Sequence, residues 1–262
     1  MSPVLALARK ELSRLFATPV AYLLLAAFYL ALGVVFLLLL EGLQSQFQQV
    51  AAEARQSGAS APAFDLPEAL LEALIQVMGN LFLFLAPVLT MGFFAGESRQ
   101  GTLELLLTSP LSALQIALGK YLAALLFLLL MTAPAFGLSL LLAGLSSPPL
   151  PWTSALLAPL GLLLLASAML SLTLAVSSLT ESQLLSAVLG FVLLTILWLL
   201  ASFPWPLPSA AQDLFRYASL AHHFNDFTYG VLDTRHLIYW LSLTGLGLAL
   251  TGLSLHQRRW RT

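Results

Sequence analysis

Six long apolar stretches, each free of Asp, Glu, Lys and Arg, recur along the chain of 262 residues, and the charged residues lie almost wholly between them. The stretches cover residues 20–40, 73–95, 121–143, 153–179, 184–202 and 237–255. A helix rises about 1.5 Å per residue, so about 20 residues cross a hydrocarbon core of about 30 Å. The pattern predicts an all-α polytopic membrane protein with six transmembrane helices, and residues 1–262 are expected to form a single membrane domain.

Residues 2–18, ahead of the first stretch, have the spacing of an amphipathic helix that ends at Pro19. Its predicted apolar face carries Leu5, Ala8, Leu12, Leu15 and Phe16, and its polar face carries Arg9, Lys10, Ser13 and Arg14. Such a basic helix is expected to lie in the headgroup plane. A solvated juxtamembrane tail is the alternative interpretation.

Two connections are longer than turns. Residues 41–72 are rich in Gln and Glu and are expected to form a polar loop. Residues 203–236 are too polar for a span but retain several aromatic side chains, so short helices that dip into the membrane are predicted there. The candidate residues of this second segment are His223, Phe224, Asn225, Asp226, Gly230 and Asp233.

Composition agrees with a membrane protein, because 59% of the residues are hydrophobic and only 9% are charged, far from soluble averages. The 11 Lys and Arg residues against 12 Asp and Glu residues give no sign of a nucleic-acid partner. Their distribution is uneven: one side of the predicted layout holds Arg9, Lys10, Arg14, Arg99, Lys120, Arg258, Arg259 and Arg261, and the other holds Arg55, Arg216 and Arg235. By the positive-inside rule both termini and residues 96–120 are cytoplasmic.

The segment 97–112, between the second and third stretches, has the strongest local signature. Gly101 is expected to end one helix and Thr102 to cap the next, with Glu104 in its favourable first turn. Leucines follow, and Pro110 closes the segment. This pattern predicts a short helix at the cytosolic surface that transmits force from a soluble partner; an ordinary interfacial linker is the alternative.

The residue inventory excludes several kinds of chemistry. There is no Cys, and the single Gly-Lys pair at 119–120 lacks the rest of a phosphate-binding loop, so nucleotide hydrolysis is expected on another chain. The predicted spans carry no Asp, Glu, His or Arg, which disfavours ion coupling. The pair His222-His223 points to different helix faces, so no metal site is predicted.

The run GTLELLLTSP at residues 101–110 resembles the corresponding segment of ABC-type export permeases of the second class, especially the branch associated with gliding motility. Residues 8–12 (ARKEL) and 223–233 (HFNDFTYGVLD) support the resemblance, which covers essentially the whole chain. It implies a multi-pass protein of the bacterial cytoplasmic (inner) membrane.

The resemblance also implies a division of roles among these segments. Residues 2–18, with Arg9, Lys10, Glu11 and Arg14, would be an elbow helix, and residues 203–236 would form re-entrant helices. The coupling helix lies around 101–110, and the residues expected to face the ATPase are Glu97, Arg99, Gly101, Thr102, Glu104, Leu105, Thr108, Ser109, Pro110, Thr180 and Glu181. The implied partners are cytosolic ABC ATPase subunits, a second permease and an extracytoplasmic auxiliary protein. ATP and Mg²⁺ would bind to the ATPase and no cofactor to this chain.

Two functions remain open on the sequence. The first is one permease half of an ATP-driven exporter that moves an apolar or lipid-linked substrate out of the cytoplasm or inner leaflet. The second is a mechanotransmission subunit, or scaffold, that relays ATPase motion to an external partner without moving cargo. Neither reading makes the chain an enzyme, and both place membrane lipid around it.

Overall fold

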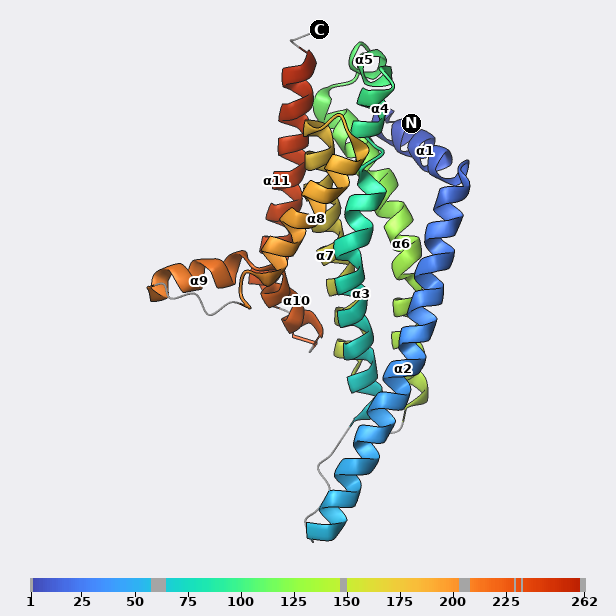
Figure 1. The fold of residues 1–262 in the computed structure, drawn as a ribbon, viewed down its shortest axis with the longest axis vertical. Helices are drawn as coiled ribbons and strands as arrows, with labels where there is room; N and C mark the ends of the chain where they lie inside the picture. The colour runs from blue at the N-terminus through green and yellow to red at the C-terminus, as the bar shows by residue number, and fades with distance from the viewer. Residues whose placement is uncertain are drawn as a thin grey trace.

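The computed structural model describes residues 2–57, 65–146, 150–202, 208–228, 230–231 and 233–259, and within these ranges all regular secondary structure is helical (Figure 1). In chain order the helices are α1 (Pro3–Phe16), α2 (Pro19–Ser57), α3 (Leu66–Thr90), α4 (Ala95–Arg99), α5 (Thr102–Leu107), α6 (Ala113–Leu145), α7 (Trp152–Leu179), α8 (Gln183–Leu199), α9 (Ser209–Ala218), α10 (Leu220–Thr228) and α11 (Thr234–Arg259). The predicted connections at 58–64, 147–149 and 203–207 lie outside the described residues.

Five helices in the described part of the chain are long and apolar enough to cross a membrane: α2, α3 with α4, α6, α7 and α11. The remaining predicted span, α8, has 17 residues and therefore a length of about 26 Å, slightly less than a hydrocarbon core. Both termini lie at the same end of the bundle, together with α4 and α5 (Figure 1). The sixth crossing at α8 therefore stays a prediction, although it is the helix that carries the chain away from this end between α7 and α11.

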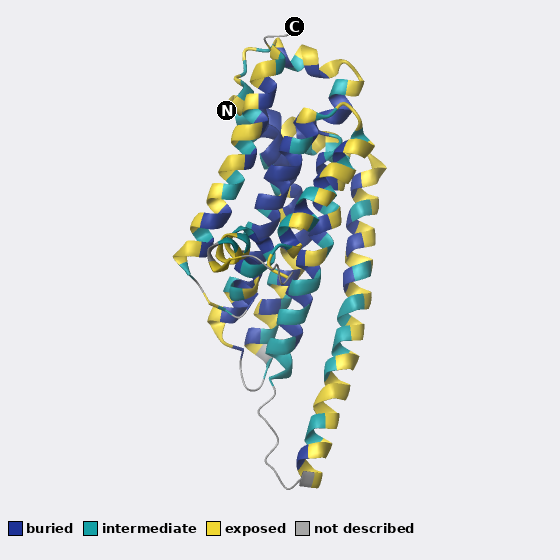
Figure 2. Cartoon of the chain, turned by 60° about the vertical axis from the view of Figure 1, so that its left-hand side comes forward, coloured by how far each residue is buried: buried dark blue, intermediate teal, exposed yellow. Residues whose placement is uncertain are grey.

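The core of the bundle is built around α7, which packs against α3, α6, α8, α10 and α11. Its buried positions form an almost continuous run, and Figure 2 shows buried residues gathered on the central helices while much of α2 is exposed or intermediate. Close approach of α11 to α7 depends on Gly247, because a Cβ there would lie 2.6 Å from the backbone of Ser171. In a lipid bilayer the hydrophobic effect does not drive helices together, so close van der Waals packing at small residues contributes to their association.

The first helix presents most of its predicted apolar face to the bundle: Ala8 is buried, and Leu12, Leu15 and Phe16 pack partly buried against the core. The buried positions of α1 are Leu7, Ala8 and Glu11, whereas Leu5 is 54% exposed. Leu5 is therefore the exception to the predicted face, and the apolar periodicity alone did not predict that Glu11 is buried with a partner on the distant helix α6. The helix packs mainly on α6, and its position in a headgroup plane stays a prediction.

Three expected boundaries were wrong, one of them the end of the predicted loop 41–72, since α3 already begins at Leu66. Helix α2 continues without a break to Ser57, so residues 41–57 are helical and not a loop; their Gln, Ala, Glu and Leu residues are good helix formers. Helix α6 begins at Ala113, well before the predicted position 121, because Ser112 and Gln115 form a reciprocal capping box. Lys120 therefore lies inside a helix and not in a connection.

Residues 209–228 form two short helices, of which α9 runs across the direction of the long helices (Figure 1). Helix α10 packs under α7 and α8, where Phe224 and Phe227 are fully buried. A helical segment was predicted here, and the structure has one. Its insertion into a membrane leaflet stays a prediction.

Candidate functional site

The surface at the end that carries both termini is formed by two short helices, α4 and α5, joined by Gly101. Gly101 has φ 70°, a left-handed conformation that ends α4 and starts α5 and that other residues adopt at a cost. The expected break at Gly101 is therefore present. Thr102 was expected to cap α5, but Gly101 occupies that position and Thr102 is the first helical residue; its hydroxyl donates instead to the Glu97 carbonyl at 3.4 Å.

Helix α5 is held by its two buried leucines and leaves the remaining face open. Leu103 and Leu107 are 3% and 4% exposed, whereas Leu105 is 73% exposed. Glu104 is exposed in the first turn. The open face of α5 therefore carries Glu104 and Leu105 next to each other.

The other predicted contact residues of the segment surround this helix. Arg99, Thr108 and Pro110 are exposed and Ser109 is half-buried. The hydroxyls of Thr108 and Ser109 donate to the carbonyls of Leu105 and Leu106 at 2.9 and 2.6 Å, so they complete the C-terminal turn of α5.

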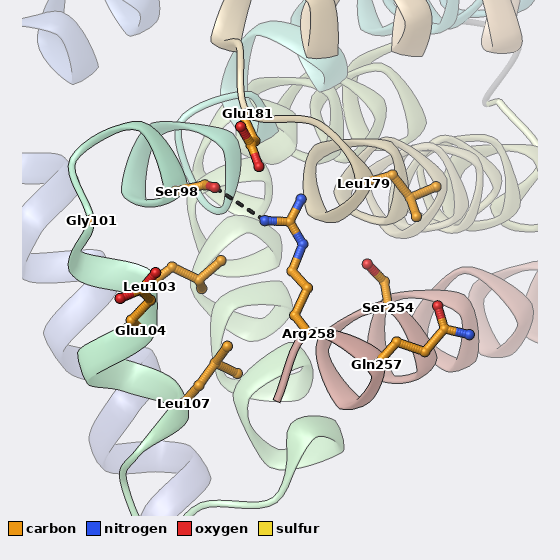
Figure 3. Close-up of a pocket in the computed structure, with 10 residues that line it drawn as sticks. All are labelled: Ser98, Gly101, Leu103, Glu104, Leu107, Leu179, Glu181, Ser254, Gln257 and Arg258. Atoms are coloured by element: carbon orange, nitrogen blue, oxygen red, sulfur yellow. Dashed lines mark hydrogen bonds between the residues drawn. The ribbon is translucent and has the colours of Figure 1, made fainter. Parts of the chain in front are cut away.

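A cavity of about 630 Å³ lies between α4–α5, the α7–α8 turn and the end of α11 (Figure 3). Its lining residues are Ser98, Gly101, Leu103, Glu104, Leu107, Leu179, Glu181, Ser254, Gln257 and Arg258. Arg258 and Glu181 extend into it from opposite sides (Figure 3), and Arg258 Nη1 donates to Ser98 Oγ at 3.1 Å. The cavity brings the predicted residues Gly101, Glu104 and Glu181 together.

The last turn of α7, which leads into the α7–α8 turn, is joined to α4 by a buried hydroxyl. Ser177 Oγ accepts hydrogen bonds from the backbone N–H groups of Phe94 and Ala95 at 3.3 and 3.2 Å. These are N-terminal donors of α4 that have no partner within the helix. Thr180, half-buried in the turn, donates to the Val176 carbonyl at 3.3 Å. The C-terminal end of α7 is therefore hydrogen-bonded directly to the start of α4.

Directly beneath α4 lies a buried cluster of four charged residues from three helices. Lys120 of α6 is 0% exposed, and its Nζ lies 2.7 Å from Glu97 Oε1 and 3.3 Å from Glu11 Oε1. The same Nζ donates to the Phe93 carbonyl at 2.9 Å. Arg14 closes the cluster from the surface, 2.7 Å from Glu97 and 3.2 Å from Glu11.

This cluster is electrically balanced, with two cations and two carboxylates. A buried lysine without a counter-ion would be strongly unfavourable, so the pairing explains why Lys120 can be enclosed. Because Glu11 lies in α1, Glu97 in α4 and Lys120 in α6, the cluster links the first helix to the α4–α5 segment and to a long helix. Two predicted groups of residues, which had been assigned separate roles, thus share one ion network, while Arg9 and Lys10 of α1 are exposed.

The predicted residues of the 203–236 segment lie elsewhere, at the far end of α11. Phe224 is buried against Gly79, and Asn225 is exposed. Gly230 has φ 70°, and Asp233 Oδ1 accepts from the backbone N–H of Arg235 at 2.8 Å. His223 and Asp226 each contact His236, a residue that was not among the candidates. No group of three or more potential metal ligands occurs among the described residues.

Comparison with known families fits this geometry. Residues 5–233 match the family described as ABC-2 family transporter protein. The chain belongs to this family. No curated protein matches the chain. As an ABC-2 family member with several apolar helices, the protein is a multi-pass membrane subunit of an ABC transporter whose partner is an ABC ATPase. Assignment to the gliding-motility branch stays a prediction.

The sequence had pointers to the parts that were missed. Lys120 immediately precedes a long apolar stretch without a break in helix-forming residues, and a capping box at Ser112 and Gln115 places it inside α6. Glu11 follows Leu7 and Ala8 by one helical turn and lies on the same buried face of α1. Their pairing across a large sequence separation had no local signal.

Proposed function

We propose that this ABC-2 family protein is the permease subunit of an ATP-driven exporter and that α4, α5 and the α7–α8 turn receive motion from a separate ATPase. The observation that carries the proposal is the continuity of this surface. The exposed face of α5 and the cavity beside it are joined to α1 and α6 by the buried ion cluster and to α7 by Ser177. A force applied at α5 would therefore reach α1 and the two long helices α6 and α7 through packed, hydrogen-bonded contacts.

The end with α5 is the cytoplasmic end in this proposal. It holds most of the basic residues, including Arg9, Lys10, Arg99 and Arg258, as the positive-inside rule requires. The ATPase would carry ATP and Mg²⁺, and this chain would bind neither.

The proposed cargo is an apolar or lipid-linked molecule that leaves the cytoplasm or the inner leaflet. Large parts of α2 and α8 expose apolar side chains, such as Leu30, Leu38, Leu184 and Ile196. These faces suit lipid, a second permease and an apolar cargo better than an ion. We propose that two permeases, identical or closely related, form the path between them.

Cysteine cross-linking tests the ATPase surface, because the chain contains no native Cys. Glu104→Cys and Glu181→Cys are expected to cross-link to the ATPase encoded beside the gene, and Asn225→Cys at the far end is not. Leu105→Asp is expected to abolish co-purification of the ATPase, since it puts a charge on an exposed docking residue. The matched control is Leu214→Asp, whose parent side chain is 66% exposed on α9. Equal ATPase recovery with both variants would refute the proposed surface.

A mechanotransmission role is the second candidate, and α2 is the observation that favours it. This helix has 39 residues, about 58 Å at 1.5 Å per residue, and its C-terminal part projects beyond the other helices (Figure 1). Such an extension could contact an extracytoplasmic partner. ATP-dependent transfer of a fluorescent phospholipid by the reconstituted complex would support export; ATP turnover that responds only to an added external partner would support mechanotransmission.

A further inference from the structure

Two buried histidines meet at the far end of α11, away from the proposed ATPase surface. His223 of α10 is 2% exposed and His236 of α11 is 7% exposed. Their Nδ1 atoms lie 2.5 Å apart. On the outer sides, His223 Nε2 lies 2.7 Å from the Tyr217 carbonyl oxygen and His236 Nε2 lies 2.7 Å from Asp226 Oδ2. The four groups form one continuous hydrogen-bonded chain across α9, α10 and α11.

The partners in this chain determine where its hydrogens are. The Tyr217 carbonyl can only accept, so His223 must carry its hydrogen on Nε2. A neutral His223 then has a bare Nδ1, which accepts from Nδ1–H of His236. The Asp226 carboxylate also accepts, so His236 Nε2 must donate to it. His236 therefore carries hydrogens on both ring nitrogens and is an imidazolium.

Other proton counts leave a contact unsatisfied. Two neutral imidazoles beside an ionised carboxylate have only two ring hydrogens for three contacts, so two acceptor atoms would face each other at one contact. Two imidazoliums would put two N–H groups and two positive charges against each other. The side chain of Asp226 is 40% exposed, so the site opens to water through this carboxylate. One extra proton satisfies all three contacts and leaves the group with no net charge.

We propose that His223, His236 and Asp226 form a proton-binding site, which holds one proton at neutral pH and thereby fastens α10 to α11. The ligand is the proton itself, shared along the chain from the solvent-exposed carboxylate to the buried ring. Loss of this proton leaves two nitrogen lone pairs opposed and releases the contact between the helices. This site is independent of the ATPase surface and of the nature of the cargo.

The surroundings limit the site to a single proton. Burial is the main cause that lowers the pKa of His223 to about 4 from its usual value of 6.5, and nearby His236 and His222 lower it further. The other titratable groups around the site are Tyr217 and Arg216 of α9, His222 of α10 and Tyr239 of α11. Asp233 and Arg235 are near His236 in sequence, and α3, which also packs on α10, carries Glu68 and Glu72 in its first turns. Helices α7 and α8, which also pack on α10, carry no titratable side chain.

Nitrogen NMR of the full chain labelled with ¹⁵N-histidine in lipid nanodiscs reads the protonation states directly. At about pH 7.5, where an ordinary histidine is mostly neutral, one of the four histidines is expected to be doubly protonated and another to be a neutral Nε2–H tautomer. The doubly protonated signal should be lost in His236→Asn and kept in His222→Asn, a control from the same cluster that is outside the hydrogen-bonded chain. Four neutral histidines in the folded wild type would overturn the proposal.

Asp226→Asn provides a test that does not remove a ring. Because Asp226→Asn removes the negative charge that stabilises the imidazolium, the doubly protonated signal of this variant should titrate about one pH unit lower, or more, than that of the wild type. Hydrogen exchange of residues 209–228 should then rise at neutral pH, relative to exchange of α7 in the same sample. An unchanged titration in this variant would contradict the proposed site.

Discussion

Replacement of Lys120 by Leu provides the sharpest test of how the α4–α5 segment is anchored. The side chain is 0% exposed, and the substitution removes contacts to Glu97 Oε1 at 2.7 Å and Glu11 Oε1 at 3.3 Å. It leaves two buried carboxylates with only the surface cation Arg14. Breaking a buried pair by removing one partner costs about 3–5 kcal/mol, and the Phe93 carbonyl loses its donor as well. We expect Lys120→Leu to destabilise the protein by this amount.

Arg14→Ala is the matched control, because it removes the other cation of the same cluster. The Arg14 side chain is 44% exposed, so water replaces part of its role and the expected cost is at most about 1 kcal/mol. Reversible unfolding in mild detergent would compare the two variants, with hydrogen exchange of residues 95–107 as a local readout. The exchange should rise strongly in Lys120→Leu and little in Arg14→Ala.

The combined variant Glu11→Leu, Glu97→Leu and Lys120→Leu separates charge burial from packing. With no buried charge left to desolvate, much of the lost stability should return, because apolar replacement of a complete buried ion group is often neutral or stabilising. The reasoning would be refuted if Lys120→Leu cost no more than Arg14→Ala, or if the combined variant were less stable than Lys120→Leu alone.

Three further predictions follow from single contacts. Gly101→Ala should cost about 1–2 kcal/mol because of the left-handed φ of 70° and should weaken ATPase binding, whereas Gly92→Ala, with nothing within 4 Å of its Cβ, should do neither; equal unfolding and pull-down results would contradict this. Gly161→Ala places a Cβ 2.4 Å from Phe227 Cβ and should cost about 1–3 kcal/mol by overpacking, measured against Gly137→Ala, whose Cβ meets open space. Because burial lowers the pKa of His223 to about 4 from 6.5, the unfolded chain takes up its proton first on acidification, so thermal stability should fall as pH drops from 6.5 towards 4; a flat profile through that window would contradict the burial of a neutral ring.

The helical membrane architecture could be predicted from the sequence because it depends on local properties. Apolar length specifies which segments can span a bilayer, and a glycine followed by helix formers predicts the break between α4 and α5. The family segment at 101–110 likewise pointed to the surface at which Glu104 and Glu181 line one cavity. Each of these signals depends on residues that are close in sequence, and the long apolar helices and the break between α4 and α5 are present in the structure.

Errors occurred where boundaries depended on caps or on tertiary contacts. A polar composition suggested a loop at 41–57, yet the same residues continue α2 because nothing in them stops a helix. The position of Lys120 just before an apolar stretch suggested that it lies in the connection before that span, whereas the capping box at Ser112 starts α6 ahead of Lys120. Composition describes solvent preference, whereas helix ends are decided by single hydrogen bonds.

The sequence by itself determined that this is a helical membrane protein of the ABC-2 type with a short surface helix near residue 104, because apolar periodicity and a local motif are sufficient for that. Only the tertiary structure decided that Glu11, Glu97 and Lys120 share one ion cluster and that His223 meets His236. These residues are brought together by the packing of α1 on α6 and of α4, α6, α10 and α11 on α7. Their protonation and their energy depend on burial and distance, which no local pattern contains.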